Sequence, residues 1–245
     1  MLELHEFLFL ALAFFSEIIG TASGVSSSSI FVPLAKLLET VQTTLVLTAV
    51  LHVAGNTVRA FIFGRDTNWI LVFKFGVPSL FFTALGAQYS DYFSSQIFSF
   101  VLGIFLVAMA SFLLIKKVDF AFKGKWLPYA GGALSGLLTG LLGSGGAIRS
   151  LAMAGFQLNP VAFVATSTVI DFSGDVLRLM IYLKKGYLTD DHQFYIPLLI
   201  VIAILANIAL EKWIRNLHSD QFKKIILAFV FCLGWVSIIS SFIKN

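Results

Sequence analysis

Long apolar runs separated by short polar segments make up most of the hydrophobic pattern of the chain. Several runs are close to the roughly 17–25 residues that a membrane-spanning helix needs. They cover residues 42–64, 69–89, 96–115, 159–183, 194–210 and 225–242. The chain opens with a further apolar segment, MLELHEFLFLALAFFSEIIG, which carries no lysine or arginine ahead of its apolar run and no small-residue cleavage motif. We therefore expect a first membrane helix there rather than a cleaved signal peptide.

Composition agrees with this pattern. Hydrophobic residues make up 58% of the 245 residues and charged residues only 12%, against about a quarter in ordinary soluble domains. The sequence therefore predicts an all-α polytopic protein of the cell (inner) membrane, with the lipid bilayer as its surroundings. The net charge of +4 does not indicate a nucleic-acid partner, because the lysines cluster between the apolar runs, where the positive-inside rule explains them. Cys232 is the single cysteine, so neither an intramolecular disulfide nor a cysteine-built metal site is possible.

The chain also repeats itself. The segments GTASGVSSSSIFVPL and TAVLHVAGNTVRAFIFG recur as GLLTGLLGSGGAIRSL and STVIDFSGDVLRLMIYLKKG. Equivalent positions lie 119 residues apart, since 171 − 52 = 119. At this offset His52, Gly55, Asn56, Arg59 and Pro78 align with Asp171, Gly174, Asp175, Arg178 and Pro197. We predict two homologous repeats, residues 1–115 and 127–245, joined by a basic linker at 116–126 within one membrane domain.

Each repeat begins with an apolar run interrupted by a glycine- or serine-rich patch. Broken helices at corresponding positions of two halves are typical of transporter binding sites near the bilayer midplane. If the broken segments are re-entrant, the halves are inverted relative to each other, and more lysines and arginines lie on the linker side of the membrane. If they cross fully, the halves are parallel and the charge asymmetry is smaller, so the positive-inside rule favours inversion.

Charged residues in the apolar runs are candidates for function, because each costs at least about 2.5–3.5 kcal/mol at the centre of a membrane. Asp171, Asp175 and Arg178 follow an i, i+4, i+7 spacing, which places them on one stripe of a helix. The equivalent stripe in the first repeat holds His52, Asn56 and Arg59. We expect the two stripes to line one central cavity and to form a charge network or a proton-coupling path.

The second glycine-rich patch, Gly143, Ser144, Gly145 and Gly146, precedes Arg149. A helix that restarts after a glycine break offers unpaired N–H groups and a positive dipole to an anion, and an arginine one turn later adds bidentate donors. In the first repeat the matching break supplies hydroxyl groups from Ser26, Ser27, Ser28 and Ser29. These residues predict an oxyanion site.

Structural alternatives exist for these residues. Arg149 is either a ligand of the anion or a counter-ion of Asp171 or Asp175. The two aspartates either titrate as a pair or simply neutralise arginines. Arg59 is close to the end of its run and could extend to the membrane surface. His52 could be a buried hydrogen-bonded residue, and the glycines could serve helix packing.

The two broken segments, together with a helix that opens in Ala165-Thr166-Ser167, resemble the TauE/SafE (TSUP) family of sulfite and organosulfonate exporters over nearly the whole chain. The resemblance implies a secondary carrier for small sulfur-containing anions, without a cofactor. It places the family's glycine-rich turn on Gly143–Gly146 and its Thr-Ser pair on Thr166 and Ser167. The chain departs from the family in its serine-rich first break and in Thr48-Ala49 at the first-repeat equivalent of Thr-Ser.

The leading hypothesis is therefore a transporter of sulfite or an organosulfonate, with proton coupling as one alternative. A membrane-embedded enzyme using Asp171 and Asp175 as acid and base, or as metal ligands with His52, is the main competitor. The chain lacks the H-E-x-x-H and G-x-S-x-G motifs that such an enzyme could use. A passive anion channel is the third hypothesis.

Overall fold

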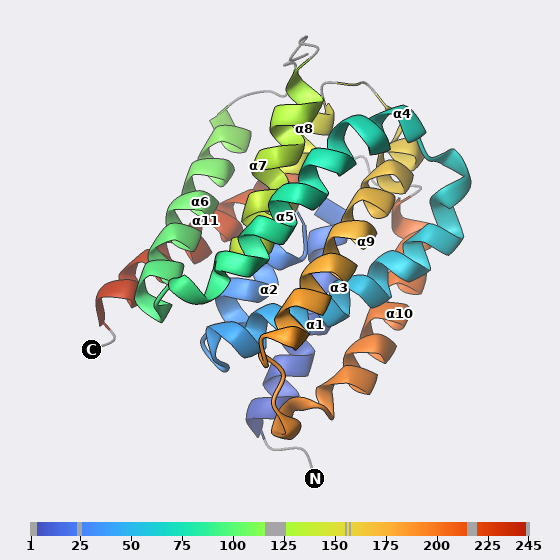
Figure 1. The fold of residues 1–245 in the computed structure, drawn as a ribbon. Helices are drawn as coiled ribbons and strands as arrows, with labels where there is room; N and C mark the ends of the chain where they lie inside the picture. Colours follow the sequence, from blue (N-terminus) through green and yellow to red (C-terminus); the bar gives the residue numbers. More distant parts are fainter. Residues whose placement is uncertain are drawn as a thin grey trace.

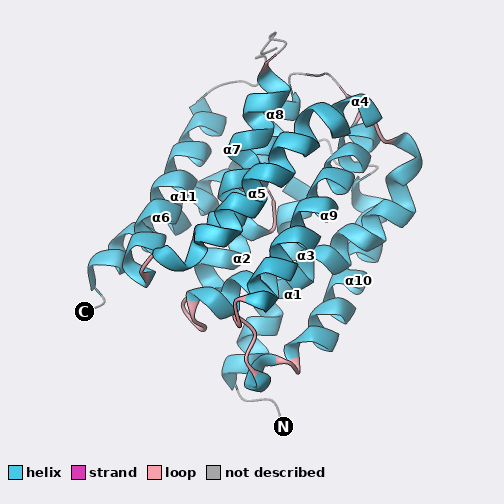
Figure 2. Cartoon of the chain, viewed as in Figure 1, coloured by secondary structure: helices cyan, strands magenta, loops and turns pink. Residues whose placement is uncertain are grey.

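The computed structural model describes residues 4–23, 26–115, 126–154, 156, 158–214 and 220–243. Throughout these residues the regular structure is helical, without a strand (Figure 2). The first part of the chain forms α1 (Leu4–Ser23), α2 (Ser28–Ala35), α3 (Val41–Phe63), α4 (Trp69–Leu71), α5 (Val77–Tyr89) and α6 (Ser95–Ile115). The second part forms α7 (Leu127–Leu142), α8 (Gly146–Ala154), α9 (Pro160–Lys184), α10 (Tyr195–Ile214) and α11 (Asp220–Ile243).

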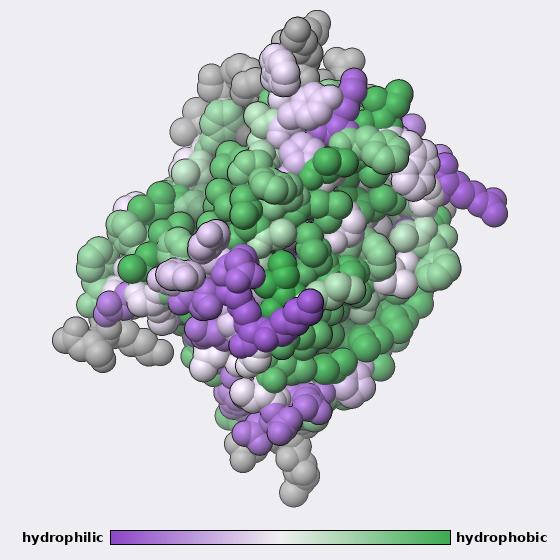
Figure 3. All heavy atoms as spheres, viewed as in Figure 1, coloured by the Kyte–Doolittle hydropathy of each residue, from purple (hydrophilic) through white to green (hydrophobic). Residues whose placement is uncertain are grey.

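The apolar runs of the sequence coincide with the long helices. A π-helical turn, Val72–Gly76, joins α4 to α5, so the run at 69–89 is helical from end to end. Within the described part of the chain, four segments are long and apolar enough to cross a membrane: Val41–Asp66, Trp69–Tyr92, Ser95–Phe112 and Asp190–Ala209. Apolar side chains cover most of the middle of the face seen in Figure 3, and hydrophilic ones gather toward its lower end and upper right edge. An apolar outer surface of this kind suits a lipid environment.

Helices α3 and α9 begin in the same way. The Thr40 side chain accepts a hydrogen bond from the Thr43 N–H at the start of α3, and the Asn159 side chain accepts one from the Ala162 N–H at the start of α9. Each bond satisfies one N–H group that the first turn of a helix leaves unpaired. The two caps lie 119 residues apart (159 − 40 = 119), which is the offset of the repeated sequence segments.

Both broken segments fold back on themselves. After α2, the chain returns to the start of α1, where His5 Nε2 lies 3.2 Å from the Leu38 carbonyl oxygen and 3.2 Å from Glu39 Oε1. In the second part, Pro128 at the start of α7 and Phe156 after α8 line the same pocket. With 8 and 9 residues, α2 and α8 are about 12–14 Å long, too short to cross a membrane. Each broken segment therefore forms a helical hairpin with one long and one short arm.

Helices from the two parts of the chain interleave (Figure 1). In the centre α3 packs against α9. Around this pair, α5 packs against α7 and α9, α10 packs against α1 and α3, and α6 pairs with α11. The predicted repeats therefore do not form two separate lobes, and the central pair brings the two polar stripes to one place.

Glycines allow α7 to approach α5 closely. Gly132, Gly136 and Gly140 recur every fourth residue, on one face of α7. A Cβ atom at Gly136 would lie 2.8 Å from the Ser79 carbonyl carbon, and one at Gly86 would lie 2.9 Å from the Leu141 nitrogen. Such small-residue contacts are a common way for membrane helices to pack. Small-residue packing therefore accounts for the glycines of α7, which precede the Gly143–Gly146 patch.

We predict that Gly136→Ala lowers the thermal stability of the detergent-solubilised protein. The added methyl group forces α7 away from the Ser79 backbone, and overpacking of this kind costs about 1–3 kcal/mol, a loss of several degrees in Tm. Gly64→Ala is the matched control, because no atom lies within 4 Å of a Cβ at that position. An unchanged Tm for Gly136→Ala would contradict the close contact between the helices.

Candidate functional site

A cavity of about 90 Å³ lies where the two breaks meet the central helix pair. Most of the residues predicted from the sequence line it: Ser26, Ser27, Ser28, His52, Asn56, Arg59, Gly143, Gly145, Gly146, Arg149, Ser167, Asp171 and Asp175. Ser29, Ser144, Thr166 and Arg178 are not among its lining residues.

The N-terminal ends of α2 and α8 face each other at this cavity. Ser29 Oγ lies 3.1 Å from Ser144 Oγ across the two breaks, and a Cβ atom at Gly146 would lie 2.6 Å from Ser26 Oγ. Ser26 has φ of 105°, an unusual conformation for a residue with a side chain, and its hydroxyl contacts that of Ser28 at 2.8 Å. Two positive helix ends and several hydroxyl groups thus meet at one small space.

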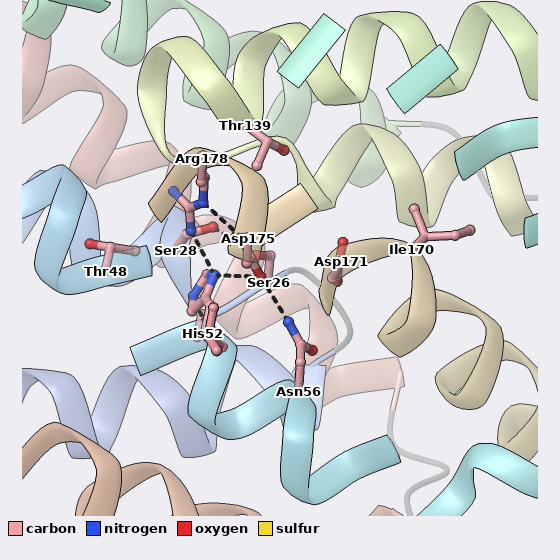
Figure 4. A network of polar contacts seen from close by, with 12 residues as sticks. Ser26, Ser28, Thr48, His52, Asn56, Thr139, Ile170, Asp171, Asp175 and Arg178 are labelled. Atoms are coloured by element: carbon pink, nitrogen blue, oxygen red, sulfur yellow. Dashed lines mark hydrogen bonds and ion pairs between the residues drawn. The ribbon is translucent and has the colours of Figure 1, made fainter. Parts of the chain in front are cut away.

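The central helices are joined by a pair of equivalent residues. Asn56 Nδ2 donates a hydrogen bond of 2.8 Å to Asp175 Oδ2, and these positions are 119 residues apart. On either side, Arg59 Nη2 donates to Asn56 Oδ1 and Arg178 Nε donates to Asp175 Oδ1, each at 2.8 Å. Figure 4 shows the Asp175 side of this network. The four side chains form a continuous chain of contacts across α3 and α9.

Arg59 extends this network to two further helices. Its Nη1 lies 2.9 Å from Glu17 Oε1 on α1 and 2.9 Å from Asn207 Oδ1 on α10. Asn207 Nδ2 also donates to Glu17 Oε1 at 3.1 Å. The Arg59 side chain is only 12% exposed, so the hypothesis that it extends to the membrane surface is wrong. Gly55 makes room for the contact, since a Cβ there would lie 2.7 Å from Glu17 Oε1.

Sequence reasoning did not assign a role to Glu17 or Asn207. Both are buried in the structure. The signal available in the sequence was a polar residue within an apolar segment. Thr166 also differs from its expected role, because its Oγ1 accepts a hydrogen bond of 2.9 Å from the Asn68 backbone N–H rather than facing the cavity.

Arg149 forms an ion pair with Asp171. Of the two counter-ions considered from the sequence, Asp171 is therefore the partner of Arg149, while Asp175 pairs with Arg178. The Arg149 Nε atom is buried and has no hydrogen-bond partner in the described structure. The Asp171 side chain is 28% exposed, against 10% for Arg149. Both members of this ion pair line the cavity, and the carboxylate is the more exposed of the two.

The described residues contain no group of three or more histidine, cysteine, aspartate or glutamate side chains placed to hold a metal ion.

The chain was also compared with models of protein families. The family model described as "Sulfite exporter TauE/SafE" matches residues 9–236. Comparisons with curated proteins and with solved structures returned no significant match.

We predict that Asp175→Asn destabilises the protein strongly. The substitution leaves the buried Arg178 guanidinium without its counter-ion and puts an amide where two donors converge, and breaking a buried ion pair costs about 3–5 kcal/mol. Asp91→Asn is the matched control, because Asp91 pairs with Lys185 at 2.6 Å with its side chain 47% exposed, and such pairs contribute less than about 1 kcal/mol. Thermal unfolding in detergent measures both; equal losses would contradict the proposed importance of the buried pair.

Proposed function

The chain belongs to the TauE/SafE family of sulfite exporters, and we propose that it is a secondary carrier that holds a small sulfur oxyanion, such as sulfite, in the cavity between the two helix breaks. The family consists of transporters rather than enzymes. The apolar helices and the family together identify the chain as a multi-pass membrane protein.

The observation that supports this proposal most directly is the meeting of α2, α8 and Arg149 at one cavity. Two helix N-termini attract negative charge, and the guanidinium group adds a full positive charge with donors suited to oxyanions. Hydroxyl groups of Ser26, Ser27 and Ser28 line the same space.

Charge balance supports proton coupling. In the buried network Glu17, Asp171 and Asp175 face Arg59, Arg149 and Arg178, so the carboxylates and guanidinium groups balance one to one. An entering anion adds a negative charge without a partner in a low-dielectric space. A proton taken up by Asp171 restores the balance and frees Arg149 for the anion.

Asp171 suits this role better than Asp175. Asp171 forms an ion pair with Arg149 and is the more exposed member of that pair. Asp175 is buried and receives hydrogen bonds from both Asn56 and Arg178. We therefore propose that Asp171 carries the proton, while Asn56, Arg59, Asp175 and Arg178 form the fixed part of the charge network.

We also propose that the two halves are inverted repeats. With a re-entrant hairpin in each half, three crossings remain per half: α3, α4–α5 and α6 in the first, and α9, α10 and α11 in the second. An odd number of crossings reverses the orientation of the second half. His52 and Asn56 lie near the middle of α3, and Asp171 and Asp175 near the middle of α9, so the site falls near the bilayer midplane, around which inverted halves can alternate access.

We predict that Arg149→Ala reduces sulfite flux into proteoliposomes by at least about tenfold, since a charged hydrogen bond contributes about 1.5–3 kcal/mol. Arg65→Ala is the control, because Arg65 is exposed at the end of α3. Unchanged flux in Arg149→Ala would reduce Arg149 to a structural counter-ion of Asp171. Absence of flux for sulfite and other sulfur oxyanions in the wild type would overturn the carrier proposal.

The role of Asp171 predicts a separate result. Asp171→Asn cannot exchange a proton and no longer competes for Arg149, so its flux should lose the response to an imposed pH gradient and its KM for sulfite should fall. Asp66→Asn, an exposed position, is expected to retain the wild-type response. Flux in Asp171→Asn that still follows the pH gradient would remove Asp171 as the proton carrier.

A further inference from the structure

Both ring nitrogens of His52 have polar partners inside the site. Nδ1 lies 3.2 Å from Arg178 Nη2, and Nε2 lies 3.0 Å from Ser27 Oγ. The side chain is largely buried between α3, α9 and the start of α2, and Figure 4 shows its ring next to Arg178 and Asp175. These two partners determine which ring nitrogen carries the hydrogen.

The contact with Arg178 fixes where the ring carries its hydrogen. A guanidinium group has only donors, so the nitrogen that faces it has to accept. Nδ1 of His52 therefore has no hydrogen, and the hydrogen of the neutral ring is on Nε2. From this position Nε2–H donates to Ser27 Oγ. We infer that His52 is a positioning residue, neutral and in its Nε2–H form, which orients the Ser27 hydroxyl group to donate to the transported anion.

The other charged groups around the ring agree with the neutral form. Asp175 Oδ2 lies 3.8 Å from Nδ1, beyond hydrogen-bond range, and its carboxylate already accepts from Arg178 and Asn56. A second hydrogen at Nδ1 would point at the Arg178 guanidinium. The buried carboxylate of Glu17, on α1, is also near but is paired with Arg59.

The hydroxyl hydrogen of Ser27 can be donated to a ligand. It stands at the start of α2, but its side chain makes no capping hydrogen bond to the helix, and it lines the cavity. Because its oxygen accepts the hydrogen of His52, its own hydrogen goes to a second acceptor. Glu17 lies close enough to attract it on the protein side, and a bound oxyanion takes that place on the cavity side.

The position of His52 in the repeat can be compared with its equivalent in the second half. His52 is equivalent to Asp171, at the offset of 119 residues (171 − 52 = 119). One half of the protein thus uses this position for a fixed neutral donor next to the anion, and the other uses it for the proposed proton carrier. The inference rests on the proposed function, and it identifies the specific contact by which the first half holds the anion.

The form of the ring can be measured without transport. In protein labelled with ¹⁵N-histidine, the His52 signals are assigned by their loss in His52→Gln, which separates them from those of the other histidines, His5, His192 and His218. At neutral pH we expect Nε2 to carry a hydrogen and Nδ1 to carry none. A hydrogen on Nδ1, alone or together with one on Nε2, would overturn the inference.

Transport kinetics test the action through Ser27. We expect His52→Ala and Ser27→Ala each to raise the KM for sulfite about tenfold, with kcat changed by less than about twofold, because a single hydrogen bond to a charged ligand is lost. In the Ser27→Ala background, His52→Ala is expected to add less than about a further twofold, since the two act through one bond. His52→Gln keeps one N–H donor and one acceptor, so it should restore a KM close to that of the wild type.

His192→Gln provides the matched control, because His192 contacts Glu39 and Thr189 away from the cavity; its KM should equal that of the wild type. A full tenfold effect of His52→Ala in the Ser27→Ala background, or failure of His52→Gln to restore KM in a folded protein, would overturn the action through Ser27. If the wild type carries no sulfite, the carrier proposal fails, and the position of the ring hydrogen alone decides the assignment of His52.

Discussion

Buried charge is the constraint on which the rest of this structure depends. Arg59 and Arg178 lie inside the helix bundle, where an unpaired guanidinium group is prohibitively costly. The partners of both guanidinium groups lie where α3 contacts α9, at the equivalent positions Asn56 and Asp175. Two aspartates there would repel each other, but Asn56 accepts from Arg59 on one side and donates to Asp175 on the other. An amide can do both at once, and a carboxylate cannot. The halves therefore differ at this position because they meet there.

The buried polar contacts are of two kinds: some join helices to one another, and others border the cavity. Glu17, Arg59 and Asn207 tie α1, α3 and α10 together, and Gly55 leaves space for that contact. Arg149 and Asp171 form a pair that borders the cavity. A carrier needs both kinds of contact, since some charges must hold the helices through the cycle while others exchange partners with the substrate.

Much of this arrangement could be predicted from the sequence. The apolar runs mark the long helices, and the i, i+4, i+7 spacing places Asp171, Asp175 and Arg178 on the stripe that faces α3. Partners across helices could not be predicted in the same way, because helical periodicity defines a face but not the residue opposite it. The contact of Arg149 with Asp171 rather than Asp175 is one case, and the use of Thr166 to bind the Asn68 backbone is another. Asn207 was missed because a single amide in an apolar run has no periodic signal.

The interleaving of the helices has a consequence for how the protein is made. Helix α5 packs against α7 and α9, which follow it in the chain. Likewise, α1 and α3 pack against α10, which is synthesised later. As the ribosome releases the chain from the N-terminus, Glu17 and Arg59 enter the membrane well before Asn207 is synthesised. The ion pair between them can form first and shield both charges from lipid. Neither half completes its packing alone, so assembly in the membrane ends only when the last helices arrive.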